Sequence, residues 1–216
     1  MRQSAIDLSS ECSQAERARI RAAIREHLRP GNFLEIGTAA GGTLKQIIGW
    51  TREAGVATRF WVLDPFTYFE DQLEKVRANL RGAEIDPDEV EFLIGTTDSQ
   101  LALQRALGTR FSAIFIDGDH RALPVTKDLQ WAEQLEVGGL IFAHDYCAKF
   151  EGVIWAIDRF LARNPGFELL GRSETLVVLR RKDDRLVPVD AAELRRARIV
   201  QTLLKWKYSI RKRLAR

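Results

Sequence analysis

FLEIGTAAGGT, at residues 33–43, decides the fold. The apolar residues at its start favour a short buried strand, and the glycine-rich turn after them leads into a helix from about Thr43. Gly37, Ala39 and Gly42 fit the spacing G-x-A-x-x-G, a relaxed dinucleotide-binding fingerprint. Small residues there let the backbone approach a ligand at the start of the helix, although a tight strand-to-helix turn explains the same pattern.

Outward from this stretch, short apolar runs alternate with helical segments, which predicts an α/β fold with a parallel sheet. The last two apolar runs are separated by only four residues, which is too short for a crossover helix, so they must pair antiparallel. We expect strands at residues 32–36, 59–63, 90–94, 113–116, 140–143, 167–170 and 175–179, and helices at about 10–28, from 43, and at about 67–81, 99–107, 121–135 and 152–163.

Acidic side chains lie at the carboxyl ends of the first predicted strands, where open α/β sheets bind their ligands. Glu35 falls in the last turn of the first strand, where a buried carboxylate needs a partner; a cationic ligand suits it and a pyrophosphate does not. Asp64 follows the second strand and either accepts the hydroxyls of a ribose or caps the turn before Pro65. After the third strand, Thr97 and Asp98 either flank an adenine ring or cap the next helix.

The ends of the fourth and fifth strands each present a carboxylate and an imidazole. Asp117 and His120 follow the fourth strand, and His144 and Asp145 follow the fifth. Carboxylates that lie close together repel one another unless a cation bridges them. A hard divalent ion, Mg²⁺ or Mn²⁺, held by Asp117 and Asp145 with His144 as a third ligand, resolves this repulsion. Helix capping and pairing with nearby basic residues is the structural alternative.

These stretches resemble the class I S-adenosylmethionine-dependent methyltransferases over about residues 30–180. The resemblance implies a Rossmann-like sandwich whose seven-stranded, mostly parallel sheet ends in an antiparallel hairpin. Within that superfamily the chain is most similar to metal-dependent O-methyltransferases that methylate sugar hydroxyls, such as the macrolide-sugar enzymes or the 1-O-methyltransferase of methylmannose polysaccharide. The motifs that carry it are FLEIGTAAGGT (33–43), WVLDP (61–65), IGTTDS (94–99), IFIDGDH (114–120) and GGLIFAHDY (138–146).

The resemblance also implies roles for particular residues. Asp117 and Asp145 become metal ligands, while relatives often carry a carboxylate at the position of His144, so its role as a ligand departs from the family pattern. His120 matches the general base of the sugar-methylating branch, and His144 is the competing base. The implied S-adenosylmethionine contacts are Glu35, Gly37, Thr38, Ala39, Thr43, Asp64, Thr97, Asp98 and Asp117.

The charge of the chain is unevenly distributed. The formal net charge of +3 combines +9 from residues 195–216, which contain no acid, with −6 from residues 1–194. We therefore divide the chain into a methyltransferase domain at residues 1–185 and a basic amphipathic C-terminal helix at residues 186–216. The apolar stripe of this helix recurs every three or four residues and consists of Ile199, Leu203, Trp206, Ile210 and Leu214.

The sequence leaves the partner of this apolar stripe open. Docking on the domain itself or on a second subunit, which would make a homodimer, is the first expectation. An anionic membrane surface comes next, followed by an acidic glycan or nucleic acid, of which nucleic acid is the least favoured. Cys12 and Cys147 are the only cysteines, and no signal peptide or long apolar segment is visible, so we expect a cytoplasmic protein.

The chemistry that fits these residues is a metal-dependent methyl transfer from S-adenosylmethionine to a hydroxyl of a saccharide or related polyhydroxyl metabolite. A metal would lower the pKa of the hydroxyl, and His120 would accept its proton. A catechol-like phenol is the nearest alternative acceptor. A nicotinamide-dependent oxidoreductase is less favoured because Glu35 would face the pyrophosphate. A non-enzymatic adaptor that acts through residues 195–216 is the third alternative.

Overall fold

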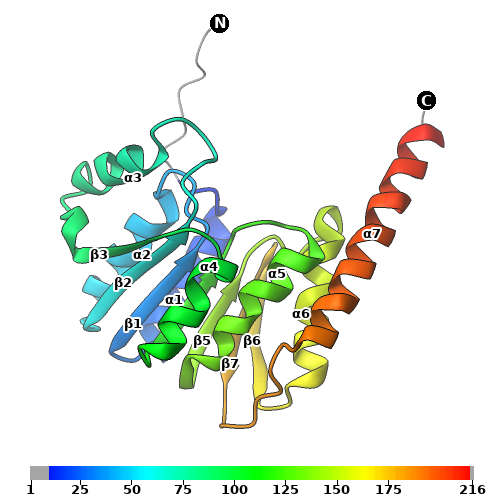
Figure 1. Cartoon of the computed structure of the whole chain (residues 1–216). Coiled ribbons are helices and arrows are strands. Elements are labelled where there is room, and N and C mark those ends of the chain that lie inside the picture. Colours follow the sequence, from blue (N-terminus) through cyan, green and yellow to red (C-terminus); the bar gives the residue numbers. More distant parts are fainter. Residues whose placement is uncertain (1–9, 215–216) are drawn as a thin grey trace, which may run out of the picture.

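The computed structural model describes residues 10–214. Their centre is a seven-stranded sheet (Figure 1). Its strand order is β3-β2-β1-β4-β5-β7-β6. β1 to β5 pair in parallel, and β7 pairs antiparallel with both β5 and β6, which confirms the predicted fold. The strands are β1 (Gly31–Ile36), β2 (Thr58–Asp64), β3 (Val90–Ile94), β4 (Phe111–Ile116), β5 (Leu135–Ala143), β6 (Phe167–Ser173) and β7 (Leu176–Arg181).

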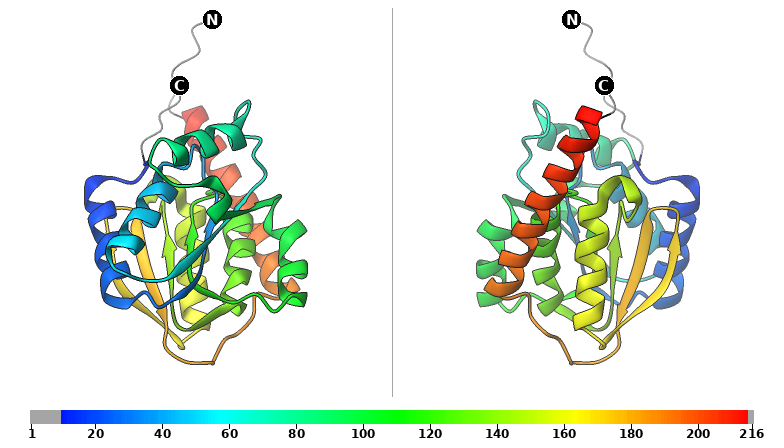
Figure 2. Two further views of the ribbon diagram at one scale, coloured as in Figure 1. Left: turned by 90° about the vertical axis from the view of Figure 1, so that its left-hand side faces the viewer. Right: turned by 90° about the vertical axis from the view of Figure 1, so that its right-hand side faces the viewer.

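Helices cover both faces of the sheet, as the two edge views of Figure 2 show. One face packs against α1, α2 and α3, and the other against α4, α5 and α6, with α7 lying over α5 and α6. The helices are α1 (Gln14–His27), α2 (Gly42–Glu53), α3 (Gln72–Arg81), α4 (Thr97–Ala106), α5 (Ala122–Asp128), α6 (Glu151–Arg163) and α7 (Ala191–Leu214), with 3-10 turns η1 (Pro87–Glu89), η2 (Leu129–Glu133) and η3 (Ala148–Phe150).

The alternation of side chains along β1 determines on which face of the sheet Glu35 lies. Leu34 and Ile36 pack into the core under α4 to α6, whereas Phe33 packs into the core under α1 to α3. Because successive side chains point to opposite faces of a sheet, Glu35 lies on the same face as Phe33. The carboxyl group therefore ends up beneath α1 and α2, at the end of the strand.

Three predicted helices have different bounds in the structure. The helix expected at 10–28 begins at Gln14, because Ser13 and Glu16 form a reciprocal capping box there. The helix expected at 67–81 begins at Gln72, since Asp71 has a left-handed backbone (φ 55°) that no α-helix accommodates. The helix expected at 121–135 is α5 followed by the 3-10 turn η2, so its second half winds more tightly.

The loop after β1 passes very close to the loop after β4. Gly37 has a φ of +83°, and a Cβ atom at this position would lie 2.6 Å from the carbonyl oxygen of Asp117 and from the Cα of Gly118. Only glycine satisfies both the backbone conformation and the space. The glycine-rich turn is thereby held against the residues that follow β4.

We expect Gly37→Ala to lower the free energy of unfolding by at least about 2 kcal/mol, because left-handed strain and a backbone clash add together. Gly49→Ala is the matched control. Gly49 lies inside α2 with open space around its Cα, so alanine there should raise the free energy by about 0.5–1 kcal/mol. Urea unfolding of both variants measures the two changes, and equal changes would contradict the close approach at Gly37.

Candidate functional site

The loops after the parallel strands and one side of α7 enclose a cavity of about 1370 Å³. Its position at the carboxyl ends of the strands agrees with the general rule for open α/β sheets. Glu35 and Thr43 line a small adjoining hollow that shares Gly37 and Asp117 with the cavity. The predicted residues that line the cavity itself are Gly37, Thr38, Ala39, Asp64, Thr97, Asp98, Asp117 and His120.

Glu35 is a buried acid without a full set of partners. Its side chain is 1% exposed, and within the described chain its Oε2 atom has no hydrogen-bond partner. Burial, reinforced by the charges of Asp117 and Asp64, raises the pKa of Glu35 to about 8. A buried carboxyl group that has one oxygen without a partner, beside a glycine-rich loop, is suited to a bound cation or amine.

Asp64 ties the ends of β1 and β2 together. Its Oδ2 atom accepts a hydrogen bond from the backbone N–H of Thr38 at 3.0 Å, and its Oδ1 atom accepts from the backbone N–H of Phe66 at 2.6 Å and from Gln72 Nε2 at 3.3 Å. Burial raises the pKa of Asp64. The turn-capping alternative is therefore present, and the carboxylate still lines the cavity where a ribose would lie.

The side chains of Thr97 and Asp98 already have protein partners. Thr97 Oγ1 donates to Asp128 at 2.6 Å and accepts from Trp131 Nε1 at 3.0 Å, while Asp98 pairs with Lys127. Burial raises the pKa of Asp128 to about 7. The predicted adenine contact at these two positions stays a prediction, and the backbone at the start of α4 is the part best placed to make it.

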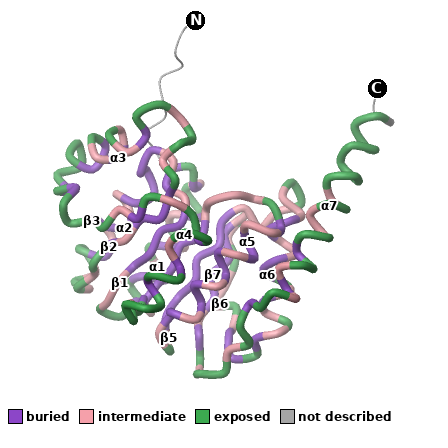
Figure 3. Tube along the Cα trace, viewed as in Figure 1, coloured by how far each residue is buried: buried purple, intermediate pink, exposed green. Residues whose placement is uncertain are grey.

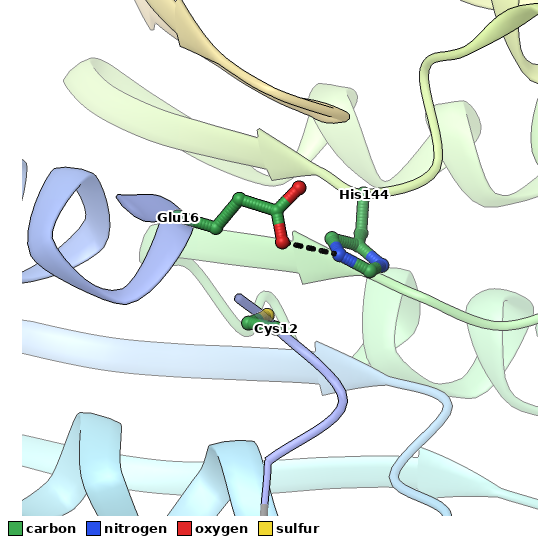
Figure 4. A group of neighbouring side chains, drawn as sticks. All are labelled: Cys12, Glu16 and His144. Atoms are coloured by element: carbon green, nitrogen blue, oxygen red, sulfur yellow. Dashed lines mark hydrogen bonds and ion pairs between the residues drawn. The ribbon is translucent and has the colours of Figure 1, made fainter. Parts of the chain in front are cut away.

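His144 lies between three carboxylates. Its Nδ1 atom is 3.0 Å from Asp117 Oδ1 and 3.6 Å from Asp145 Oδ2, and its Nε2 atom is 3.2 Å from Glu16 Oε2 (Figure 4). Burial acts to lower the pKa of His144, but hydrogen bonds to Asp117 and Asp145 and the charge of Asp117 raise it strongly. The imidazole is 8% exposed and has carboxylates on both sides, so it is poorly placed to meet an acceptor in the cavity.

Glu16 is a site residue that sequence reasoning missed. It lies at the start of α1, more than a hundred residues from His144, and its Oε1 atom accepts hydrogen bonds from the backbone N–H and the hydroxyl of Thr175 at 2.9 and 2.6 Å. Burial opposes ionisation, but these bonds and that from Ser13 lower the pKa of Glu16 to about 2. Cys12 lies beside Glu16 and His144 (Figure 4).

His120 is the imidazole that reaches the cavity. Its side chain is 39% exposed and stacks on Phe150 with the ring centroids 4.2 Å apart. Its Nε2 atom is 2.6 Å from Asp145 Oδ2, and this bond raises the pKa of His120. Asp145 thus holds one ring nitrogen, as the orienting acid of a catalytic dyad does.

The residues after β4 and β5 fit a divalent cation. One oxygen of Asp117, one of Asp145 and a nitrogen of His120 lie within 4.8 Å of one another, and His144 Nδ1 lies close to the same two carboxylates. Neighbouring ligands on an octahedral Mg²⁺ ion lie about 3 Å apart, close to the 3.0 and 3.6 Å that separate His144 Nδ1 from Asp117 and Asp145. Glu16 on the far nitrogen of His144 is the kind of outer partner that metal-bound histidines have.

One side of α7 forms a wall of the cavity, which the sequence did not indicate. Leu204, Lys205, Tyr208 and Arg211 line it, and they recur over two turns of the helix. The predicted apolar stripe is not the side that docks on the domain. Instead, a different side of α7, which includes the fully buried Ala197, packs against α5 and α6.

Comparison with known proteins finds a methyltransferase family model and solved methyltransferase structures of similar fold. Residues 34–146 match the model of a family described as a methyltransferase domain, and no curated protein matches the chain. Among solved structures, the O-methyltransferase NovP has a TM-score of 0.66 at 22% identity and covers 78% of this chain and 80% of its own.

Two further solved structures share the fold. An O-methyltransferase from Bacillus cereus, in complex with SAH, has a TM-score of 0.61 at 18% identity and covers 82% of this chain and 84% of its own. CalS11, a TDP-rhamnose 3'-O-methyltransferase of calicheamicin biosynthesis, has a TM-score of 0.60 at 18% identity and covers 78% of this chain and 80% of its own.

Proposed function

The chain belongs to a family of methyltransferase domains, and from this premise we propose that it moves the methyl group of S-adenosylmethionine to a hydroxyl of a saccharide or related polyhydroxyl metabolite. We further propose that Asp117, Asp145 and His144 hold a divalent cation and that His120 is the general base. The observation that carries this proposal is the convergence of two carboxylates and two imidazoles beside one cavity.

The part of the site that contains Glu35 and Asp64 suits S-adenosylmethionine. Glu35 offers a buried carboxyl oxygen without a partner to a cationic ligand, and Asp64 offers oxygens to a ribose. Gly37, where the loop after β4 leaves no room for a side chain, holds the glycine-rich turn in the lining of the cavity. S-adenosylmethionine carries a sulfonium, an amino group and a ribose, so its chemistry matches this arrangement.

The part of the site near His120 and Asp145 would remove the proton of the acceptor hydroxyl. A divalent cation, when bound, would lower the pKa of the acceptor hydroxyl and orient its oxygen. His120, held at Nε2 by Asp145, would take the proton with its other ring nitrogen as the oxygen attacks the methyl carbon. The carbon–sulfur bond would break in line, with its electron pair left on sulfur, so that S-adenosylhomocysteine would be the second product. Phe150 stacks on His120 and limits its rotation.

The choice of a sugar hydroxyl rests on the resemblance of the site motifs to the sugar-methylating branch. It is supported by the shared fold with CalS11, a TDP-rhamnose methyltransferase. A catechol-like phenol would use the same cation and cofactor. A panel of hydroxylated glycans and catechols, assayed for transfer of a labelled methyl group, separates the two classes. A cytoplasmic location and a homodimer remain predictions.

Calorimetric titration with S-adenosylmethionine, S-adenosylhomocysteine and NAD, each with and without Mg²⁺, tests the proposal. We expect binding of the two adenosyl ligands and none of NAD. Binding of NAD alone would replace the proposal with a nicotinamide-dependent reaction. Binding of neither class would leave a non-enzymatic role through the basic helix.

The pH dependence of cofactor affinity tests the role of Glu35. With its pKa raised to about 8, Glu35 must lose a proton to meet a cationic ligand. Affinity for S-adenosylmethionine should therefore rise by up to about tenfold per pH unit from about pH 6 to pH 8. We expect Glu35→Gln to remove this dependence and the exposed change Glu53→Gln to preserve it. Calorimetry from about pH 6 to pH 8 measures the affinity of each variant for S-adenosylmethionine. An affinity of the unchanged protein that does not vary with pH would contradict the proposed role of Glu35.

A further inference from the structure

The outer side of α7 is an uncovered apolar stripe. Ile199, Leu203, Trp206 and Ile210 are 60%, 58%, 67% and 55% exposed, although they recur at the spacing of one helix face. Figure 3 shows the upper part of the helix exposed where it extends beyond the body of the protein. Exposed apolar side chains that gather along one line mark a surface that meets a partner.

The stripe lies opposite the side of α7 that contacts the domain. At 100° per residue, Ala197, Leu204 and Tyr208 fall on the far side of the helix axis from Leu203 and Ile210. Ala197 is fully buried and Leu204 is half-buried, while Tyr208 lines the open cavity and is 70% exposed. The helix therefore already has its contact with the domain, and the stripe is left for something outside this chain.

Charge selects the partner. The chain from residue 194 onward contains nine basic residues and no acid. Lys207 and Arg211 reach Glu151, but Lys205, Lys212 and Arg213 have no acidic partner in the described chain. Two copies of this helix that met stripe to stripe would bring like charges together, whereas an anionic bilayer offers both an apolar interior and negative headgroups. Trp206 also belongs to the residue types that favour a membrane interface.

We propose that α7 binds the surface of an anionic lipid bilayer and inserts the stripe Ile199, Leu203, Trp206 and Ile210 among the headgroups. In residues 10–214, no helix combines the length and apolar character that a crossing would need, so the helix lies in the plane of the interface. Because another side of α7 lines the cavity, lipid binding brings a wall of that cavity to the bilayer. An acceptor carried by a lipid would then meet the site without leaving the surface.

Flotation of the full chain with lipid vesicles tests this proposal. Vesicles of phosphatidylcholine are compared with vesicles that also contain phosphatidylglycerol, and we expect binding to the second kind alone, weakening as salt is raised. Ile210→Glu and Ser209→Glu make the same charge change at adjacent exposed positions, on the stripe and a quarter turn away from it. Ile210→Glu should weaken binding at least about tenfold, and Ser209→Glu by about fivefold or less.

Three results would overturn the proposal. Equal losses in both glutamate variants would mean that charge alone attracts the helix. Equal binding to neutral vesicles would exclude the role of the headgroups. A concentration-dependent dimer in sedimentation velocity that Ile210→Glu dissociates, without vesicle binding, would assign the stripe to a second copy. Thermal unfolding followed by circular dichroism is the control that checks whether both variants keep their fold. Neither Ser209 nor Ile210 lines the cavity.

Discussion

Replacement of His120 by alanine is expected to lower kcat by about 10²–10⁴-fold and to leave the affinity for S-adenosylmethionine unchanged. His120 is the imidazole that lines the cavity, and Asp145 fixes its Nε2 atom at 2.6 Å. Only the neutral ring accepts a proton, and Asp145 raises the pKa of His120. In the unchanged enzyme, kcat should therefore rise with pH as His120 loses its proton. Steady-state kinetics over a pH series, together with calorimetry, measures both quantities.

His27→Ala is the control for this change, because His27 lies at the end of α1 and is the one histidine of the chain outside the site. We expect it to leave kcat within about twofold. An inactive His144→Ala combined with an active His120→Ala would reverse the assignment and make His144 the base. The buried position of His144 between Glu16 and Asp117 argues for the first outcome.

The second large effect is expected from Asp145→Asn, which should abolish stimulation of turnover by Mg²⁺ or Mn²⁺ while cofactor affinity remains. Asn keeps the shape of the side chain and tolerates the left-handed backbone of this residue (φ 60°), so loss of function would report the lost charge. Mn²⁺ binding, followed by electron paramagnetic resonance without any substrate, gives a readout that does not depend on catalysis. Metal affinity should fall by at least about tenfold.

Asp119→Asn is the matched carboxylate control. Asp119 lies two residues after Asp117, but its carboxylate accepts hydrogen bonds from the backbone N–H and the guanidinium of Arg121 just before α5. We expect this variant to bind Mn²⁺ and to respond to it as the unchanged enzyme does. Undiminished metal stimulation in both Asp117→Asn and Asp145→Asn would exclude the proposed cation site.

Much of the fold was predictable because strand signals are local. β3 has the predicted bounds at Val90–Ile94, and the antiparallel pairing of β6 with β7 followed from a connection too short for a helix. Helix starts were less predictable. α3 begins at Gln72, several residues later than expected, because Asp71 before it has a left-handed backbone that periodicity does not encode.

The site was predictable where its residues follow strands directly. Strand-end logic placed Asp117, His120, His144 and Asp145 together, and the structure brings these side chains into contact. Glu16 could not be found this way, since its partners come from distant parts of the chain. The one local signal, Ser13 and Glu16 in the spacing of a capping box, indicates a helix start and says nothing of His144.

The position of Glu16 bears on how the protein acquires its function during synthesis. Glu16 bonds to Thr175, which lies 159 residues further along the chain, and to His144. Contacts between residues so far apart in the sequence slow folding, because the chain must close a long loop before it gains them. On the ribosome, Glu16 cannot bind Thr175 until the turn between β6 and β7 has emerged. The full set of bonds that orients Glu16 against His144 is therefore completed only after the strands that carry the other site residues have been made.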